Sequence, residues 1–213
     1  MTETFAELLR LSTMTTMQYI IGLGNPGEKY EKTRHNVGRM FVETVRAEGV
    51  FPDWSKSKGA KAFYAHGAIM GEETELLLPE TFMNRSGETV QYVCKKHAAK
   101  PEDFIVVHDD IDLPFGEVKI SHGKGAGGNN GVSSIISTLS SKDFVRIRIG
   151  IAPKQFLTGR VVRPAGGGAL EKFVLKTFSV LERQQLPAVF VKANEALELI
   201  VKDGVQVAMN KVN

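Results

Sequence analysis

Five separated segments of this 213-residue chain carry polar side chains of the kinds that bind a carbonyl group and activate water. Each segment lies beside a predicted turn or strand end, where side chains can leave the core to act on a ligand. Together they supply three amides, one imidazole and one carboxylate, which is a set suited to hydrolysis. The segments are LGNPG with Asn25, TRHN with His35, TFMNRSG with Asn84, HDDID with Asp109 and GGNNG with Asn130.

Each segment also has an ordinary structural explanation when it is taken alone. Asn25 precedes Pro26 and Gly27, so turn chemistry could account for it. His35 could be a surface histidine ahead of a helix, and Asp109 could belong to a strand end with exposed acids. The co-occurrence of all five segments is what favours a functional site.

The elements that must position these residues alternate between strands and helices. Short β-branched runs bounded by turn residues predict strands, and apolar residues at spacings of three and four predict helices. Ser179 followed by Glu182 is a capping-box pattern that begins the last helix, and Pro187 is placed to kink or divide it. The predicted strands are residues 18–23, 61–69, 75–78, 104–107, 117–121 and 145–151, and the predicted helices are residues 36–49, 132–139, 179–204 and one that begins near residue 86.

This alternation predicts an α/β fold, in which a single domain has a mixed central β-sheet with helices on both faces. Residues 17–213 are expected to form the domain, and residues 1–16 a short amphipathic or disordered extension. Five glycines between residues 123 and 131 predict a loop, and the PAGGG sequence at residues 164–168 predicts a mobile one.

Bulk composition argues against several classes of protein. The longest apolar runs are far shorter than the about 20 residues that a membrane helix needs, so we expect a soluble protein. Cys94 is the only cysteine, which excludes an internal disulfide and suits a reducing compartment such as the cytoplasm. The net charge of +3 does not by itself indicate a nucleic-acid-binding protein, but Lys154, Arg160 and Arg163 form a local basic cluster.

A metal-dependent phosphohydrolase is one alternative, because His108, Asp109, Asp110 and Asp112 place four possible ligands within five residues. Side chains on a strand alternate between its two faces, so these four cannot all converge without a loop. No second His/Asp cluster elsewhere in the sequence would complete the ligand shell. We therefore expect no metal and no organic cofactor, and activity that survives chelation would exclude this alternative.

Taken together, the five segments resemble those of the bacterial-type peptidyl-tRNA hydrolases, in the same order and at similar separations from Tyr19 to about Asn210. This resemblance implies an enzyme that hydrolyses the ester between peptide and tRNA. It implies that His35 is the catalytic base, that Asp109 orients and polarises it, and that Asn84 holds the attacking water or the developing oxyanion. The amino end of a helix favours a neutral imidazole, whereas a nearby carboxylate opposes this effect.

The resemblance also implies how the substrate is held. Asn25, Asn84 and Asn130 match amides that bind the peptide and the terminal nucleotide. Tyr30 and Phe82 match an apolar wall of the site, although Phe82 could equally be a core residue. The implied partner is peptidyl-tRNA, and the protein is expected to be a monomer. A further alternative is a relative that binds RNA without catalysis. It would be excluded if the protein hydrolyses its substrate and His35→Ala loses this hydrolysis while still binding tRNA.

For the tRNA phosphates, the resemblance implies contacts from Lys119 and Arg148. The chain departs from many relatives at Ser121, where they carry a lysine, so Lys124 or His122 would have to supply that contact. Asn129 replaces a histidine that is common in relatives, and we expect little loss from this change. Residues 153–172 form a longer connection than usual in a region that acts as a lid. Arg160 and Arg163 in this connection could add phosphate contacts.

Overall fold

A single sheet lies at the centre of the structure, a computed structural model that describes residues 17–155, 161–164 and 168–213. Seven strands of this described part pair in the order β2-β3-β4-β1-β5-β7-β6. Their bounds are β1 Gln18–Gly22, β2 Ser55–Ser57, β3 Ala62–Ile69, β4 Glu72–Pro79, β5 Phe104–Pro114, β6 Val118–His122 and β7 Val145–Ala152. The regions 1–16, 156–160 and 165–167 lie outside the described residues. They contain the predicted extension, Arg160 and most of the predicted mobile stretch.

The four central strands, β4, β1, β5 and β7, run parallel. At one side β3 pairs antiparallel with β4 and β2 antiparallel with β3, and at the other side β6 pairs antiparallel with β7. Parallel strands are normally covered on both faces, which is why their sequences read as continuous apolar runs. The run Phe104–Val107 in β5 is fully buried in this way. The mixed sheet expected from the sequence is confirmed.

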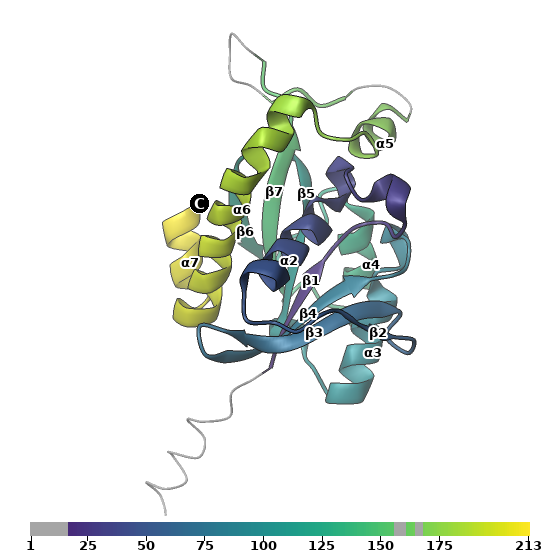
Figure 1. Cartoon of the computed structure of the whole chain (residues 1–213), viewed down its shortest axis with the longest axis vertical. Helices are drawn as coiled ribbons and strands as arrows, with labels where there is room; N and C mark the ends of the chain where they lie inside the picture. The colour runs from purple at the N-terminus through teal and green to yellow at the C-terminus, as the bar shows by residue number, and fades with distance from the viewer. Residues whose placement is uncertain (1–16, 156–160, 165–167) are drawn as a thin grey trace, which may run out of the picture.

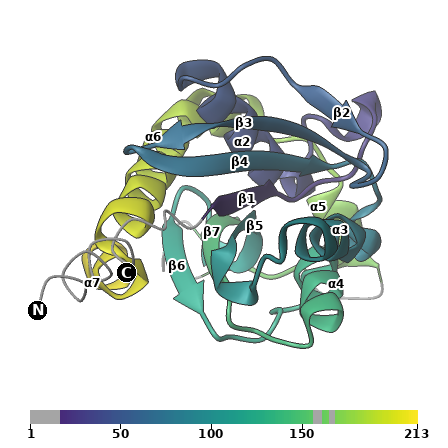
Figure 2. The same cartoon turned by 90° about the horizontal axis from the view of Figure 1, so that it is seen from below.

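Helices cover both faces of this sheet, as predicted (Figures 1 and 2). The first core cluster joins the sheet to α2, α6 and α7, and the second joins it to α3 and α4. Among the described residues, no helix is long and apolar enough to cross a membrane. The helices are α2 Val37–Glu48, α3 Gly87–His97, α4 Asn130–Leu139, α5 Ala169–Val174, α6 Val180–Asp203 and α7 Val205–Val212, with short 3-10 turns η1 Glu28–Tyr30, η2 Arg34–Asn36, η3 Met83–Arg85 and η4 Pro101–Asp103.

The long helix α6 begins with the predicted capping box. The Ser179 hydroxyl accepts a hydrogen bond from the Glu182 backbone N–H at 3.2 Å, and the Glu182 carboxylate accepts one from the Ser179 N–H at 2.6 Å. Pro187 lies inside α6, but the helix continues past it to Asp203. The helix ends at Gly204, whose φ of 83° suits glycine. The short helix α7, which follows, was not predicted.

Strand β5 is longer than the sequence predicted, and this changes where Asp109 lies. The prediction ended the strand at residue 107, but β5 continues to Pro114 because its far end pairs with β7 through Asp110 and Gly150. On its other side β1 stops at Gly22, beside Val107. The HDDID segment is therefore strand, and its first residues lie beyond the end of β1, where space is left for another element. Strand β2 and helix α5 were also missed, and α5 begins within the predicted loop 153–172.

Helix α2 fills that space because it approaches the sheet through glycine. A Cβ atom on Gly38 would lie 2.1 Å from the backbone oxygen of Val107 in β5. A Cβ atom on Gly22 in β1 would lie 2.8 Å from the backbone oxygen of Gly38. Helix and strand backbones therefore touch directly, and η2, which leads into α2, meets β5 at Asp109.

We predict that Gly38→Ala lowers the free energy of unfolding. Alanine favours a helix over glycine by about 1 kcal/mol. The added methyl group, however, would overlap a backbone oxygen that has no room to move, and overpacking of this kind costs about 1–3 kcal/mol. The urea midpoint of unfolding should therefore fall.

Gly125→Ala is the matched control, since a Cβ atom there meets nothing within 4 Å and its φ is not in the positive region. Its midpoint should stay the same or rise slightly. A midpoint for Gly38→Ala at or above that of the unmodified protein would contradict the close approach of α2.

Candidate active site

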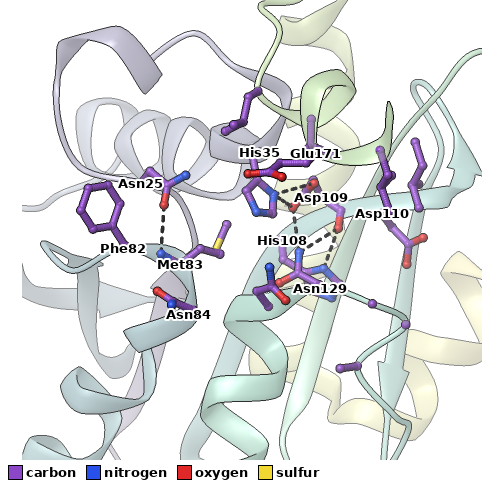
Figure 3. Close-up of a pocket in the computed structure, with 18 of the residues that line it drawn as sticks. Asn25, His35, Phe82, Met83, Asn84, His108, Asp109, Asp110, Asn129 and Glu171 are labelled. Carbon is purple, nitrogen blue, oxygen red and sulfur yellow. Dashed lines mark hydrogen bonds and ion pairs between the residues drawn. The ribbon is translucent and has the colours of Figure 1, made fainter. Parts of the chain in front are cut away.

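A pocket of about 450 Å³ opens at the carboxyl ends of β1, β4 and β5 (Figure 3). In open α/β sheets this edge is where ligands usually bind. All the residues that the sequence assigned to catalysis or to substrate binding line this pocket: Asn25, Tyr30, His35, Phe82, Asn84, Asp109 and Asn130. They come from loops and strands that are far apart in the sequence, so the fold brings the five segments together.

His35 and Asp109 meet although 74 residues separate them. The Nδ1 atom of His35, in η2, lies 2.9 Å from each of the two carboxylate oxygens of Asp109, in β5. Both residues are buried, with 9% of His35 and 5% of Asp109 exposed. Because the carboxylate accepts a hydrogen bond from Nδ1–H, the proton of the neutral ring stays on Nδ1 and the lone pair on Nε2 is free to act as a base.

Two opposing effects act on the His35 imidazole. Burial lowers the pKa of His35, but the charge of Asp109 and its hydrogen bond together raise it further, so the pKa lies above its ordinary value of 6.5. The sequence suggested that a helix end would oppose the carboxylate, whereas in the structure the opposing effect is burial. His35 is therefore a stronger base than a free histidine.

Arg34 anchors the turn that carries His35. One guanidinium nitrogen donates to the Thr177 backbone oxygen at 2.8 Å, and the other pairs with the Glu182 carboxylate at 2.7 Å. The guanidinium also lies over the Phe173 ring, 4.6 Å from its centre. The sequence analysis did not single out Arg34, because its partners lie more than 140 residues away.

Asn25 and Asn36 join the loops on the other side of His35. The Asn36 side chain accepts a hydrogen bond from the Asn25 N–H and donates one to the Asn25 backbone oxygen, both at 2.9 Å. Gly24 leaves room for this contact, since a Cβ atom there would lie 2.8 Å from Asn36. The Asn25 side-chain oxygen in turn accepts from the Met83 N–H at 2.9 Å. Asn25 therefore has a structural role as well as a place in the pocket.

The neighbouring wall of the pocket is amide and aromatic. Asn84 lies in η3, and Asn130 is the first residue of α4. Both residues are exposed. The rings of Tyr30 and Phe82 meet edge to face, with centroids 6.3 Å apart. Phe82 is 55% exposed, so it is not a core residue and leaves an apolar surface open beside the asparagines.

Asn129 is the site residue that the sequence analysis undervalued. Its side-chain N–H donates to the Asp109 carboxylate at 2.8 Å. Its side-chain oxygen accepts from the backbone N–H groups of Gly131 at 3.0 Å and Val132 at 3.1 Å, which caps α4. Asparagine directly before a helix is a common cap, so the sequence contained a signal for this half of its role.

The predicted phosphate contacts lie around the edge strand β6. Lys119 in β6 is directly opposite Arg148 in β7, so the two half-buried side chains share one face. Arg148 donates to the Asp110 carboxylate at 2.7 Å. Ser121 is buried opposite Arg146.

In the predicted lid, Arg163 is exposed and pairs with the Asp112 carboxylate at 2.8 Å. Arg160 lies outside the described residues. Of the two lid arginines, therefore, only Arg163 can be placed, and it lies beside the end of β5.

The acidic residues of β5 are each engaged by another group. Asp109 contacts His35, Asp110 pairs with Arg148, and Asp112 pairs with a lid arginine. In the part of the chain that the structure describes, no group of three or more His, Cys, Asp or Glu side chains is arranged to hold a metal ion. The three aspartates that the metal-dependent alternative would use as ligands therefore each contact a different side chain.

Comparisons with known proteins identify the family. A family model described as peptidyl-tRNA hydrolase matches residues 19–213. The peptidyl-tRNA hydrolase of Syntrophotalea carbinolica is 40% identical over 198 residues, which cover 92% of this chain and 97% of the relative. That of Nocardia farcinica is 39% identical over 194 residues, which cover 91% and 95%.

Solved structures agree with these sequence matches. The crystal structure of peptidyl-tRNA hydrolase from Acinetobacter baumannii superposes with a TM-score of 0.82 at 32% identity, covering 94% of this chain and 96% of the other. The family expected from the five polar segments is confirmed. This chain belongs to the peptidyl-tRNA hydrolase family.

Proposed function

We propose that this chain hydrolyses the ester bond between peptide and tRNA in peptidyl-tRNA, with His35 as the general base. The observation that carries the proposal is the contact of His35 with both carboxylate oxygens of Asp109, in a pocket lined by four asparagines. Membership of the family supports the reaction itself. The contact supports the assignment of roles.

In this mechanism Nε2 of His35 takes a proton from water while the water oxygen attacks the ester carbonyl carbon. Asp109 stabilises the imidazolium that forms. An N–H of Asn84 donates to the negative oxygen of the intermediate. The bond to the ribose oxygen then breaks, and that oxygen receives the proton from His35, which releases tRNA and a peptide acid. A sugar oxygen leaves more readily than an amide nitrogen, so no covalent nucleophile is needed.

Amides suit a substrate whose peptide differs each time. Asn25, Asn84 and Asn130 offer donors and acceptors that can bind a peptide backbone whatever its side chains. Tyr30 and Phe82 provide an apolar wall for the ester and the terminal base. An aminoacyl-tRNA has a charged amino group in place of the peptide amide, so it leaves these asparagines without partners and is disfavoured.

Lys119 and Arg148 are the proposed contacts to tRNA phosphate. They lie opposite one another on β6 and β7, and Arg148 would exchange Asp110 for a phosphate when tRNA binds. Arg160 and Arg163 of the lid segment 153–172 are proposed to add to them. Helix α5 supports a lid role for this segment, because Leu170 and Glu171, which belong to both the helix and the segment, line the pocket.

The remaining expectations belong to the same proposal. We propose that the enzyme is a monomer. We place it in the cytoplasm, where its substrate is made, with residues 1–16 as an extension of a domain that spans residues 17–213. A non-catalytic RNA-binding role is disfavoured because the His35–Asp109 contact is intact.

His35→Ala should lower the rate of peptide release from an N-acetylated aminoacyl-tRNA by at least about 10²-fold, the usual range for loss of a general base being about 10²–10⁴. Binding of tRNA should persist, and a chelator should leave the unmodified enzyme active. His66→Ala, which removes an exposed histidine of β3, is the matched control and should keep full activity. A rate unchanged in His35→Ala, or lost on chelation, would reject the proposed mechanism.

The pH profile of kcat/KM should report His35. A base works when it is unprotonated, so activity should fall as the pH drops through the raised pKa of His35, on a limb centred above pH 6.5. Asp109→Asn removes the group that raises this pKa and leaves burial unopposed, so the limb should move to lower pH while the plateau rate falls. A limb that stays in place in Asp109→Asn would contradict the assignment.

Salt dependence tests the phosphate contacts. Lys119→Ala and Arg148→Ala should each reduce the slope of log affinity for tRNA against log salt by about 0.7–0.9, which corresponds to one phosphate contact. Lys202→Ala, an exposed lysine near the end of α6, is the control and should leave the slope unchanged. For the lid, an unchanged slope in the Arg160→Ala, Arg163→Ala double variant would reject a phosphate role for these arginines.

A further inference from the structure

The Asp109 carboxylate contacts two side chains, and one of them has no role in the mechanism above. Asp109 Oδ1 accepts a hydrogen bond from His35 on one side and from Asn129 Nδ2, at 2.8 Å, on the other (Figure 3). We propose that Asn129 is a positioning residue of the reaction, which fixes the Asp109 carboxylate and is itself fixed by the amino end of α4. This inference rests on the proposed function of His35.

The orientation of the Asn129 amide is determined by its partners. Its oxygen accepts from the backbone N–H groups of Gly131 and Val132, which can only donate, and its nitrogen faces a carboxylate, which can only accept. A flipped amide would set donor against donor and acceptor against acceptor. Only 9% of the residue is exposed, so water competes little for these groups. These partners therefore orient the N–H of Asn129 toward Asp109.

This arrangement connects the catalytic pair to a rigid element. Asp109 lies on β5, while Asn129 follows the glycine-rich loop and caps α4. Without Asn129, the carboxylate could turn about its side-chain bonds and carry the imidazole with it. A geometry error of this kind costs rate rather than binding, because it displaces the base from the attacking water.

The hydrogen bond from Asn129 also shares the negative charge of Asp109. Removing it leaves more of that charge facing His35, so the pKa of His35 should rise and the acid limb of the pH profile should move upward. This direction is opposite to that expected for Asp109→Asn. The other charged or titratable groups near the pair are His108 and Asp110 on β5, Arg146 and Arg148 on β7 and Glu171 on α5, and the variants leave all of them unchanged.

The test compares three substitutions of one residue. Asn129→Ser keeps a good helix cap but cannot donate to Asp109 across the same distance. Asn129→Ala loses both functions, and Asn129→His offers one donor and one acceptor, as the amide does. Each variant is measured for kcat, KM and the pH profile of peptide release, and for its urea midpoint.

Asn129→Ser should lose about tenfold in kcat, as expected for a lost hydrogen bond to a charged group, with KM little changed and the acid limb moved to higher pH. Asn129→Ala should show the same limb shift together with a lower urea midpoint. Asn129→His should recover kcat to within about threefold of the unmodified enzyme and return the limb toward its original pH.

Two results would overturn the inference. One is Asn129→Ser with the kcat and acid limb of the unmodified enzyme. The other is a loss of kcat in Asn129→Ser with no movement of the limb, which would make the residue a purely structural cap. His35→Ala, assayed alongside, distinguishes these from failure of the proposed function, because only that failure leaves His35→Ala active.

Discussion

The contact between the backbones of α2 and β5 is the constraint on which the site depends. Gly38 brings the helix against the carbonyl of Val107, and no other residue type leaves room for this approach. His35 lies three residues before Gly38, and Asp109 lies two residues after Val107. Only a few residues separate His35 and Asp109 from the Gly38–Val107 contact, so this contact sets the distance between the imidazole and the carboxylate. The precision of the proposed catalytic pair comes from the packing of the core.

Asparagine side chains have two uses around this pair. Asn36, Asn25 and Asn129 hold loops together, by bonds to backbone groups of Asn25, to Met83 and to the end of α4 respectively. Asn84 and Asn130 are exposed to the pocket. Loops normally lack the hydrogen-bond ladders of regular structure, and buried side-chain amides replace them here. Side-chain amides thus hold the loops around the pocket in place, while Asn84 and Asn130 remain open to a ligand.

The sequence predicted the fold well where the signal is local. The capping box at Ser179 and the apolar run of β5 need only neighbouring residues, and both were found. The missed features depend on distant partners: β5 extends because β7 pairs with it, and Arg34 is defined by groups beyond residue 170. The pocket residues were expected from the resemblance of the five segments to a known family, and the fold brings them together. Asn129 was undervalued because its contact with Asp109 follows from tertiary packing alone.

The ion pair between Arg34 and Glu182 spans 148 residues, and this span bears on when the enzyme becomes active during its own synthesis. A growing chain on the ribosome is attached to tRNA by the same kind of ester that, as proposed, the finished enzyme cleaves. Until residue 182 has emerged, the turn that carries His35 lacks its anchor to the start of α6. The contact that holds the His35 turn can therefore form only after most of the chain, still joined to tRNA, has been made.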